Sequence, residues 1–511
     1  MKAKRLISVV LIFALACVNW SCTKAVTVKS NTPKHPKELV GEKIVGITTV
    51  KGAEIPFDEP GGKLAGTTII ANVAKESRSF PLSDVQHVWM EKRKLTTGAK
   101  VGIVAGATVV AIIVVAAISL SKRSAPIVSP SPSTGKQSSC PFVYSWDGSQ
   151  FCLDGEPYGG AIARGLARDD WSELRHLRDI NGEYRVLMTN EADETQHTDL
   201  AELWVADHPA GVRVVADGSG RLIGLSNLQR LLKAQEKTGR DLTTWLDAKD
   251  RRIWEPEPVP DAAGSLQHEI ILTFPKPAAA KDAWLVSNMA TGAWGSQIVK
   301  DMVSLLGRDA NAWLESLDKN FLRATSVYQW VNREETLRLK VDVEESSGWR
   351  TQGSFSGGGP IIAEDRVVPI DVSGVSGDRL RLRVRPPCGF WAINSFEIAY
   401  DSVGAVPFTR ISAESARTSD GTDVLKELAS ANGAYYTMPT IGDAAELRFR
   451  APIRRPAMER TFFLHTAGWY QIHLGVGGEP DQRAFNEVLN TPGAIVRFTE
   501  AQYDAWKHSN R

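Results

Sequence analysis

Residues 378–387 read DRLRLRVRPP, and residues 336–345 read TLRLKVDVEE. In both stretches apolar and charged residues alternate with a period of two, which is typical of a β-strand with one buried and one solvated face. Leu380, Leu382 and Val384 are therefore expected to point into a core. Two such strands in succession predict antiparallel sheets that pack face to face as a sandwich.

Most of the chain after residue 140 has a similar character. Further strands are predicted in the segments EYRVLMTNE (183–191), LAELWVAD (200–207), GSLQHEIILTFPKP (264–277) and DAWLVSNMA (282–290). Helices are predicted in SNLQRLLKAQEK (226–237), SQIVKDMVSLLGRDANAWLESL (296–317) and DQRAFNEVLN (481–490), where apolar residues recur at helical spacing or a cap residue precedes them. We expect a mainly β fold with a few helices.

The dipeptide Asp147-Gly148 lies between two apolar, aromatic runs. This pattern predicts a hairpin with a two-residue turn, because Asp and Gly tolerate the positive φ angles that such a turn needs. In that register Tyr144 faces Phe151.

The same register places Cys140 and Cys152 on opposite faces of the hairpin. A disulfide requires Cα atoms about 4.4–6.8 Å apart, so we predict that these two cysteines are not bonded to each other. Cys388 is an equally plausible partner for either, and buried thiols are the alternative.

The N-terminus carries a targeting pattern. Lys2, Lys4 and Arg5 precede an apolar stretch, residues 6–16, that is short for a membrane span, and Cys17 follows it. The pattern resembles a bacterial lipoprotein signal over residues 1–22, which implies lipidation of Cys17. Lipidation at Cys22, an uncleaved signal anchor and an ordinary secretory signal are the alternatives.

A second apolar stretch, VGIVAGATVVAIIVVAAISL (101–120), has no charged residue and is long enough to cross a bilayer. It predicts one transmembrane helix over residues 101–121, with a buried core helix as the alternative. Gly98, Gly102 and Gly106 recur every four residues, a spacing that lets helices associate closely in lipid. A Ser/Pro-rich linker, residues 122–139, follows.

Residues 38–95 are expected to form a small β-barrel. The segments VGITTVKGAEIPF (45–57) and FPLSDVQHVWMEKRK (80–94) resemble the Sm/SH3-like barrels of bacterial envelope lipoproteins. Further along, GW, VPIDVSG, LRLRV and FWAINSFEIAY resemble a galactose-binding-like jelly-roll sandwich, which we place at 326–402. The remainder is divided into a β-rich domain with helices at 140–325 and a C-terminal β-rich unit with a helix at 403–511. CPFVYSWDG and DHPAG also resemble segments of uncharacterised bacterial surface proteins.

The sequence contains no recognisable catalytic motif. H-E-x-x-H, G-x-S-x-G and a P-loop are all absent, and GSFSGGGP (353–360) lacks the Lys-Ser/Thr ending of a phosphate-binding loop. His465 and His473 flank Trp469 but have no third ligand at a recognisable spacing. We therefore expect no enzymatic activity, no cofactor and no metal. The net charge of +1 argues against a nucleic-acid partner.

Binding candidates come from charged and aromatic residues of the predicted sandwich. Four guanidinium groups on one strand could bind phosphate, a sulfated glycan or lipid headgroups, and exposed tryptophans stack on sugars. These candidates are Arg379, Arg381, Arg383, Arg385, Trp349 and Trp391. In the alternative interpretation, Asp342 and Glu344 neutralise the arginines across the sheet and the tryptophans belong to the core.

These features together predict a membrane-anchored protein of the bacterial cell envelope with a binding or structural role. Its expected partners are the lipid bilayer, further copies of the chain through the membrane helix, and a glycan or envelope protein. The alternative is an envelope enzyme acting on carbohydrate, which would need two carboxylates in one cleft. The side of the membrane on which the large β-rich part lies stays open.

Overall fold

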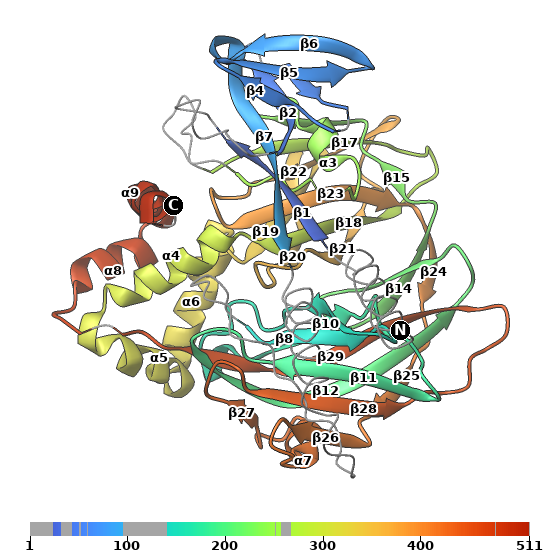
Figure 1. Cartoon of the computed structure of the whole chain (residues 1–511), viewed down its shortest axis with the longest axis vertical. Helices are drawn as coiled ribbons and strands as arrows, with labels where there is room; N and C mark the ends of the chain where they lie inside the picture. The colour runs from blue at the N-terminus through green and yellow to red at the C-terminus, as the bar shows by residue number, and fades with distance from the viewer. Residues whose placement is uncertain are drawn as a thin grey trace, which may run out of the picture.

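The computed structural model describes residues 24–31, 43–50, 53–58, 60–95, 140–250, 252–256, 267–475 and 477–509. The fold is mainly β with several antiparallel sheets and fewer helices, as predicted. Figure 1 shows a small group of sheets at the top, two larger layers of sheets below it, and helices gathered at one side.

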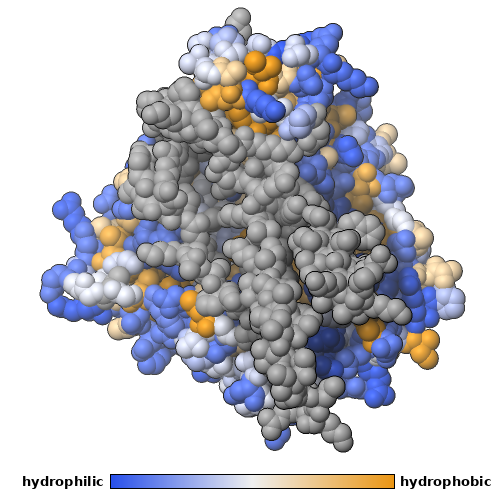
Figure 2. All heavy atoms as spheres, viewed as in Figure 1, coloured by the Kyte–Doolittle hydropathy of each residue, from blue (hydrophilic) through white to orange (hydrophobic). Residues whose placement is uncertain are grey.

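The small unit, residues 43–95, contains two short sheets around one hydrophobic cluster. The strand orders are β1-β7-β2-β3 and β4-β5-β6. The strands are β1 (Lys24–Asn31), β2 (Lys43–Thr49), β3 (Glu54–Pro56), β4 (Lys63–Ala65), β5 (Thr68–Val73), β6 (Glu76–Pro81) and β7 (Val85–Leu95), and β1 adds to the edge from outside the unit. Ile44, Ile47, Ile69 and Val88 are fully buried between the sheets. In Figure 2 hydrophobic residues also gather at the surface of this unit, whereas the visible described surface below is largely hydrophilic.

A first pair of sheets, here called the outer sandwich, begins at Phe142. One sheet has the order β10-β29-β12-β25, with β27 also paired to β12, and the other has the order β26-β28-β11-β8-β9. Residues from both sheets share one core, for example Val186, Leu203 and Leu447. The strands are β8 (Phe142–Trp146), β9 (Phe151–Gly155), β10 (Arg168–Glu173), β11 (Glu183–Thr189), β12 (Glu194–His208), β25 (Thr409–Ser412), β26 (Ser415–Thr418), β27 (Tyr436–Met438), β28 (Ala444–Arg450) and β29 (Glu459–Ile472).

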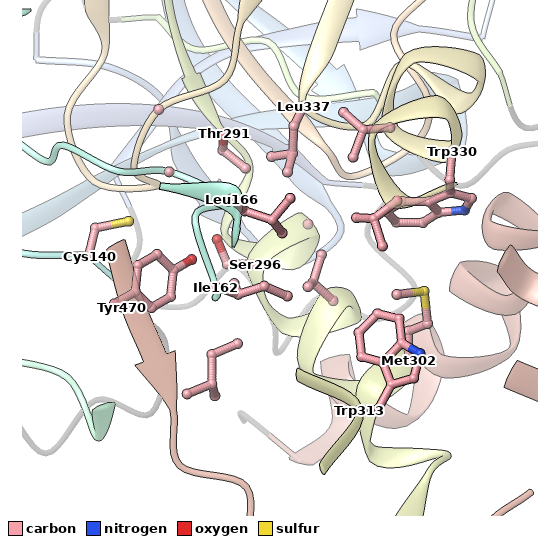
Figure 3. A pocket seen from close by; sticks show the side chains of 18 residues that line it. Cys140, Ile162, Leu166, Thr291, Ser296, Met302, Trp313, Trp330, Leu337 and Tyr470 are labelled. Carbon is pink, nitrogen blue, oxygen red and sulfur yellow. The ribbon is translucent and has the colours of Figure 1, made fainter. Parts of the chain in front are cut away.

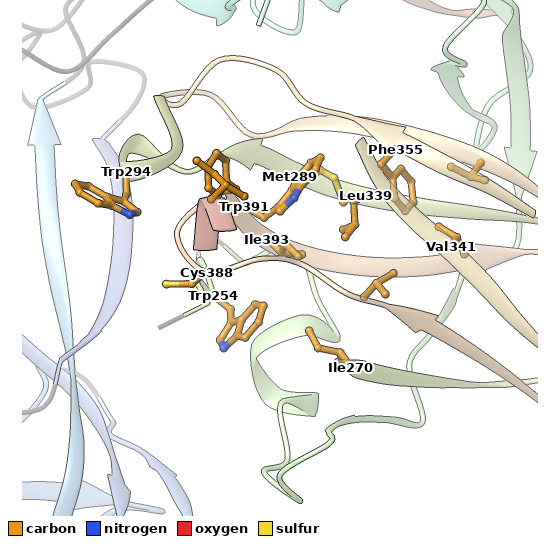
Figure 4. Packing of buried hydrophobic residues seen from close by; sticks show 14 of the residues in the cluster. Trp254, Ile270, Met289, Trp294, Leu339, Val341, Phe355, Cys388, Trp391 and Ile393 are labelled. Atoms are coloured by element: carbon orange, nitrogen blue, oxygen red, sulfur yellow. The ribbon is translucent and has the colours of Figure 1, made fainter. Parts of the chain in front are cut away.

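A second pair, the inserted sandwich, has the sheet orders β15-β23-β18-β21 and β16-β17-β22-β19-β20. Leu339, Val341, Leu380 and Leu382 are fully buried in its core, which confirms the alternation predicted for these strands (Figure 4). The strands are β15 (Gln229–Arg230), β16 (Lys233–Glu236), β17 (Ile270–Pro275), β18 (Asp282–Thr291), β19 (Arg338–Glu345), β20 (Gly348–Ser356), β21 (Glu364–Asp371), β22 (Arg379–Val384) and β23 (Trp391–Ala399).

The second sandwich is an insertion within the first. Strands β12 and β25 are neighbours in the outer sandwich, yet the whole inserted sandwich lies between them in sequence. A three-stranded sheet, β13 (Arg213–Ala216), β14 (Leu222–Ser226) and β24 (Asp401–Ala405), joins the chain entering and leaving the insertion. The strand pairing thus groups the chain differently from the divisions 140–325, 326–402 and 403–511, because β17 and β18 pair with strands beyond residue 325.

Helices cover one side of the sandwiches (Figure 1). They are α4 (Ala293–Ser304), α5 (Ala310–Lys319), α6 (Phe321–Glu334), α8 (Gln482–Asn490) and α9 (Ala494–Ser509), with short turns α3 (Thr243–Leu246), α7 (Leu425–Leu428), η2 (Leu82–Asp84), η4 (Arg164–Leu166) and η5 (Gly307–Asp309). The predicted helices at 296–317 and 481–490 are confirmed, with a break at Gly307, whose φ is +48°. α6 and α9 were not predicted.

Two local predictions were wrong. The segment 226–237 is not a helix; it forms β15 and β16, which pair with β23 and β17. The hairpin loop has four residues rather than two, so Trp146 rather than Tyr144 faces Phe151. The Asp147 carboxylate accepts the backbone N–H groups of Ser149 (2.7 Å) and Gln150 (2.9 Å), which stabilises the longer loop.

Cys140, Cys152 and Cys388 are buried, and none is in a disulfide. The absence of a Cys140–Cys152 bond agrees with the prediction. The register on which that prediction rested differs, because Cys152 faces Ser145 instead of Val143 and a β-bulge lies between Val143 and Tyr144.

Several predictions concern residues outside the described ranges: the signal over residues 1–22 with Cys17, the helix over 101–121 with Gly98, Gly102 and Gly106, and the linker over 122–139. None of the helices in the described ranges combines the length and hydropathy that a bilayer crossing requires.

Candidate ligand-binding face

The candidate arginines lie on β22, in the middle of the sheet β16-β17-β22-β19-β20. Leu380, Leu382 and Val384 point into the core, and the period of two turns Arg379, Arg381 and Arg383 to the outer face. Arg385 follows the strand end. The alternation in the sequence was thus sufficient to predict which side chains share this face.

Acidic residues of neighbouring strands pair with most of these arginines. Arg381 pairs with Glu344, Arg383 with Asp342 at 2.8 Å, and Arg385 with the buried Glu335 at 3.0 Å. Arg383 also lies 3.7 Å from Glu269. The strand register explains the pairing, because Asp342 stands directly opposite Arg383. The neutralisation across the sheet considered as the alternative is therefore found for Arg381 and Arg383, whereas Arg385 is balanced by Glu335 at the end of α6.

Arg379 differs from the other three. It is exposed, and the ion pair it makes in the structure is with the still more exposed Asp378 at 3.8 Å. Exposed pairs at such a distance contribute little, so this guanidinium is accessible to an anionic group from solution.

Trp349 lies beside the arginines as predicted. It sits on β20 opposite Glu344, half-buried, with its ring centroid 4.7 Å from the Arg383 guanidinium carbon and 5.9 Å from that of Arg381. These are cation–π distances, and they hold the indole on the outer face of the sheet.

Trp391 is not at a surface. Its side chain is fully buried in the core of the inserted sandwich, and its indole N–H donates to the Glu335 carbonyl at 2.7 Å (Figure 4). It cannot present its ring to a ligand, so its proposed binding role is corrected to a core role. Alternation did not reveal this, because β23 is buried on both faces.

An open groove of about 450 Å³ adjoins Arg381. Its lining includes the exposed Lys233 and Lys237 and the half-buried Gln235 and Thr273. Its volume lies within the range of about 300–1,000 Å³ usual for ligand sites. Sequence reasoning missed the groove because it placed residues 226–237 in a helix, whereas β16 brings Lys233 to the edge of the sheet.

The register aligns groove and tryptophan in one row across the sheet. Lys233 faces Thr273, Thr273 faces Arg381, and on the far side Glu344 faces Trp349. Five strands at about 4.8 Å spacing make this row roughly 19 Å long. The row joins cationic, hydroxyl and aromatic side chains with one carboxylate, Glu344, which is paired with Arg381.

A second pocket lies between the two sandwiches and is lined by several acids, including Asp169, Asp170, Glu364 and Asp365. Asp170 pairs with Arg168 at 2.7 Å, and Asp365 with Arg213 and with Lys249 at 3.0 Å. Although burial opposes it, these cations hold the pKa of Asp365 well below its usual range. The acids thus belong to ion pairs, and the pair between Arg175, just after β10, and Asp365 on β21 joins the two sandwiches at 3.6 Å.

This pocket has a volume of about 60 Å³, enough for about four water molecules at about 15 Å³ each. A sugar ring does not fit. The pocket gathers several acids but lacks the room for the substrate that the enzyme alternative needs.

The glycine-rich loop 353–360 packs into the same junction. A Cβ on Gly159 would lie 2.4 Å from the Gly358 carbonyl oxygen, and one on Gly359 would lie 2.2 Å from the Glu156 Cβ. These glycines permit close approach of the two sandwiches, which accounts for the motif without a bound phosphate.

An apolar cavity lies between α4, α6 and the outer sandwich (Figure 3). Met302, Trp313, Trp330 and Leu337 line it together with Tyr470. Its volume is about 40 Å³, enough for about three water molecules, so it does not hold an organic ligand in this conformation.

The two histidines have separate surroundings. His465 lies 2.8 Å from Asp169 and stacks on Trp171, whereas His473 lies 2.9 Å from Asp193. Within the described ranges no group of three or more His, Cys, Asp or Glu side chains could hold a metal ion.

Comparison with known proteins gives no match: the chain matches no family description, and no curated protein is similar enough to count as a relative.

Proposed function

We propose that this protein is a membrane-anchored component of the bacterial cell envelope that binds an acidic glycan on the outer face of the sheet β16-β17-β22-β19-β20. The observation that carries the proposal is the row from Lys233 through Arg381 to Trp349, bordered by the 450 Å³ groove. The anchoring part rests on the sequence patterns around Cys17 and residues 101–121.

An acidic glycan suits this face for two reasons. The indole of Trp349 offers an apolar surface for the C–H face of a sugar ring. Lys233 on the edge strand β16 and Arg379 on the central strand β22 are exposed cations, which carboxylate or sulfate groups can reach. Because Arg381 and Arg383 are already balanced by acids, we expect moderate affinity that depends on salt.

The test is titration calorimetry of the detergent-solubilised chain with a polyuronate and with an uncharged dextran. Trp349→Ala and Lys233→Gln should each weaken polyuronate binding about tenfold, equivalent to about 1.4 kcal/mol. Raising the salt concentration should weaken it further.

Trp146→Ala is the matched control, since Arg185 lies over that ring at 4.5 Å on a different sheet. Equal losses in Trp146→Ala and Trp349→Ala, or equal binding of dextran and polyuronate, would contradict the proposal.

A further inference from the structure

Trp89 connects the small unit to the rest of the chain. It lies on β7, before the apolar stretch 101–120, and is fully buried. Its ring meets the edge of Trp245, with centroids 4.7 Å apart and planes at 68°. Trp245 lies on α3, after that stretch, and is 1% exposed. Two parts of the chain separated by the predicted membrane segment thus share one contact.

The small unit is shaped to present this ring. A Cβ on Gly46 would lie 2.3 Å from the Trp89 ring, so only glycine leaves the space the indole occupies. The indole N–H donates to the Thr48 hydroxyl at 3.0 Å. With its polar atom satisfied inside the small unit, the ring can bury its apolar edge elsewhere.

Trp89 belongs to the hydrophobic core of the inserted sandwich rather than to the small unit's own cluster around Ile44 and Ile47. Val45 packs against that larger core as well. In Figure 1 β7 runs from the small unit toward the inserted sandwich. The contact is therefore continuous with a folded core.

We infer that the small unit and the two sandwiches occupy the same compartment. This inference rests on the proposed membrane attachment. A segment that crossed the bilayer once between residues 96 and 139 would place Trp89 and Trp245 on opposite sides, where they could not touch. The chain must return to the side from which it left. Because residues 101–120 are long enough for one crossing only, we infer that they do not span the bilayer, and the N-terminal signal is the attachment that remains.

The side of the membrane on which the sandwiches lie follows as well. Every interpretation of the N-terminal signal, whether lipidation at Cys17 or Cys22, an uncleaved anchor or an ordinary secretory signal, exports the residues that follow it. The small unit, and with it the sandwiches and their basic groove, then face away from the cytoplasm. An extracytoplasmic side is where an envelope glycan would be met.

Single cysteines test the inference in the full-length chain. Lys63→Cys places a thiol on the exposed edge of the small unit, and Ile453→Cys places one at a position 96% exposed in the outer sandwich. Spheroplasts carrying either variant are treated with a membrane-impermeant maleimide before and after permeabilisation. The parent chain is the control for labelling of native cysteines, of which Cys140, Cys152 and Cys388 are buried.

Both variants should be labelled to the same extent before permeabilisation, with no more than a twofold gain after it. Labelling of only one of them before permeabilisation would overturn the shared compartment. Labelling of neither would overturn the extracytoplasmic assignment. Sedimentation of the chain with the membranes is measured first, so a loss of membrane attachment, which would contradict the proposed function, is recognised separately.

Discussion

Glu156 is the residue whose ionisation should have the largest effect on stability. It follows β9, is 1% exposed, and accepts the backbone N–H groups of Ile361 (2.6 Å) and Ile362 (2.7 Å) across the junction of the sandwiches. Burial raises the pKa of Glu156 from 4.5 to about 8, and the nearby Glu364 and Glu191 add to the effect. The carboxyl is therefore protonated in the folded protein at neutral pH.

The pKa of Glu156 is higher in the folded protein than in the unfolded chain, and this sets the sign of the pH dependence. The folded state keeps a proton that the unfolded state has lost, so the free energy of unfolding should fall as pH rises from about 4.5 to 8. The pKa rises by about 3.5, and each pKa unit corresponds to about 1.4 kcal/mol. The free energy of unfolding should therefore fall by at most about 5 kcal/mol at pH 8 and above. Local rearrangement that admits water would lower this cost.

Glu156→Gln resembles the protonated acid and still offers an oxygen to the two N–H groups. We expect it to match the parent chain within about 1 kcal/mol at pH 5 and to be more stable by about 2–5 kcal/mol at pH 8. Urea unfolding followed by tryptophan fluorescence in detergent, at pH 5 to 8, measures the difference. Glu459→Gln, at an exposed position, is the control. Curves for Glu156→Gln and parent that stay parallel across this range would refute the reasoning.

Other predictions concern the core, the anchor, the apolar segment and the thiols. Trp391→Ala should lower the free energy of unfolding by about 3–5 kcal/mol, as expected for a buried tryptophan. Trp349→Ala, at a half-buried position, should lower it clearly less in the same urea assay. Cys17→Ala should abolish incorporation of labelled palmitate and Cys22→Ala should not; the reverse would move the lipid to Cys22. Gly102→Leu with Gly106→Leu tests the sequence-based prediction of a membrane helix: fewer crosslinked oligomers in membranes would support association in lipid and contradict the shared compartment, and an unchanged pattern would exclude association through this segment. Cys140, Cys152 and Cys388 should react with an alkylating reagent only after unfolding, and a Cys140–Cys152 crosslinked peptide in unreduced digests would contradict the structure.

The alternation of apolar and polar residues predicted the strands best where one face of the strand is buried and the other is solvated. The alternation around β19 and β22 identified both the core residues and the row of arginines. The pattern failed at residues 226–237, where Leu228, Leu231 and Leu232 recur at helical spacing. There the pairing of β16 with β17 decides the structure. Ala234 points into the core as a strand residue, and no helical stripe of leucines is formed.

The candidate site was predicted only in part for the same reason. Composition suggested arginines and aromatic residues, and strand alternation grouped the arginines. Neither composition nor strand alternation could show that Trp391 is in the core while Trp349 is at the surface. Nor could they show the acids of the junction, which come together from β10 and β21, far apart in the chain.

The insertion of one sandwich into the other constrains the order in which the chain can fold. Leu203 pairs with Leu464, 261 residues later, so β12 has no partner in β29 until nearly the whole chain has been made. Closing a loop of that length is entropically costly, and such long-range pairing is slow. Prior folding of the inserted sandwich would shorten the loop, because β14 and β24 then bring its two ends together. A chain exported from its N-terminus would meanwhile leave the long strand β12, which is largely buried in the folded protein, with open edges, and this makes that half-formed sheet the stage at which a chaperone is most needed.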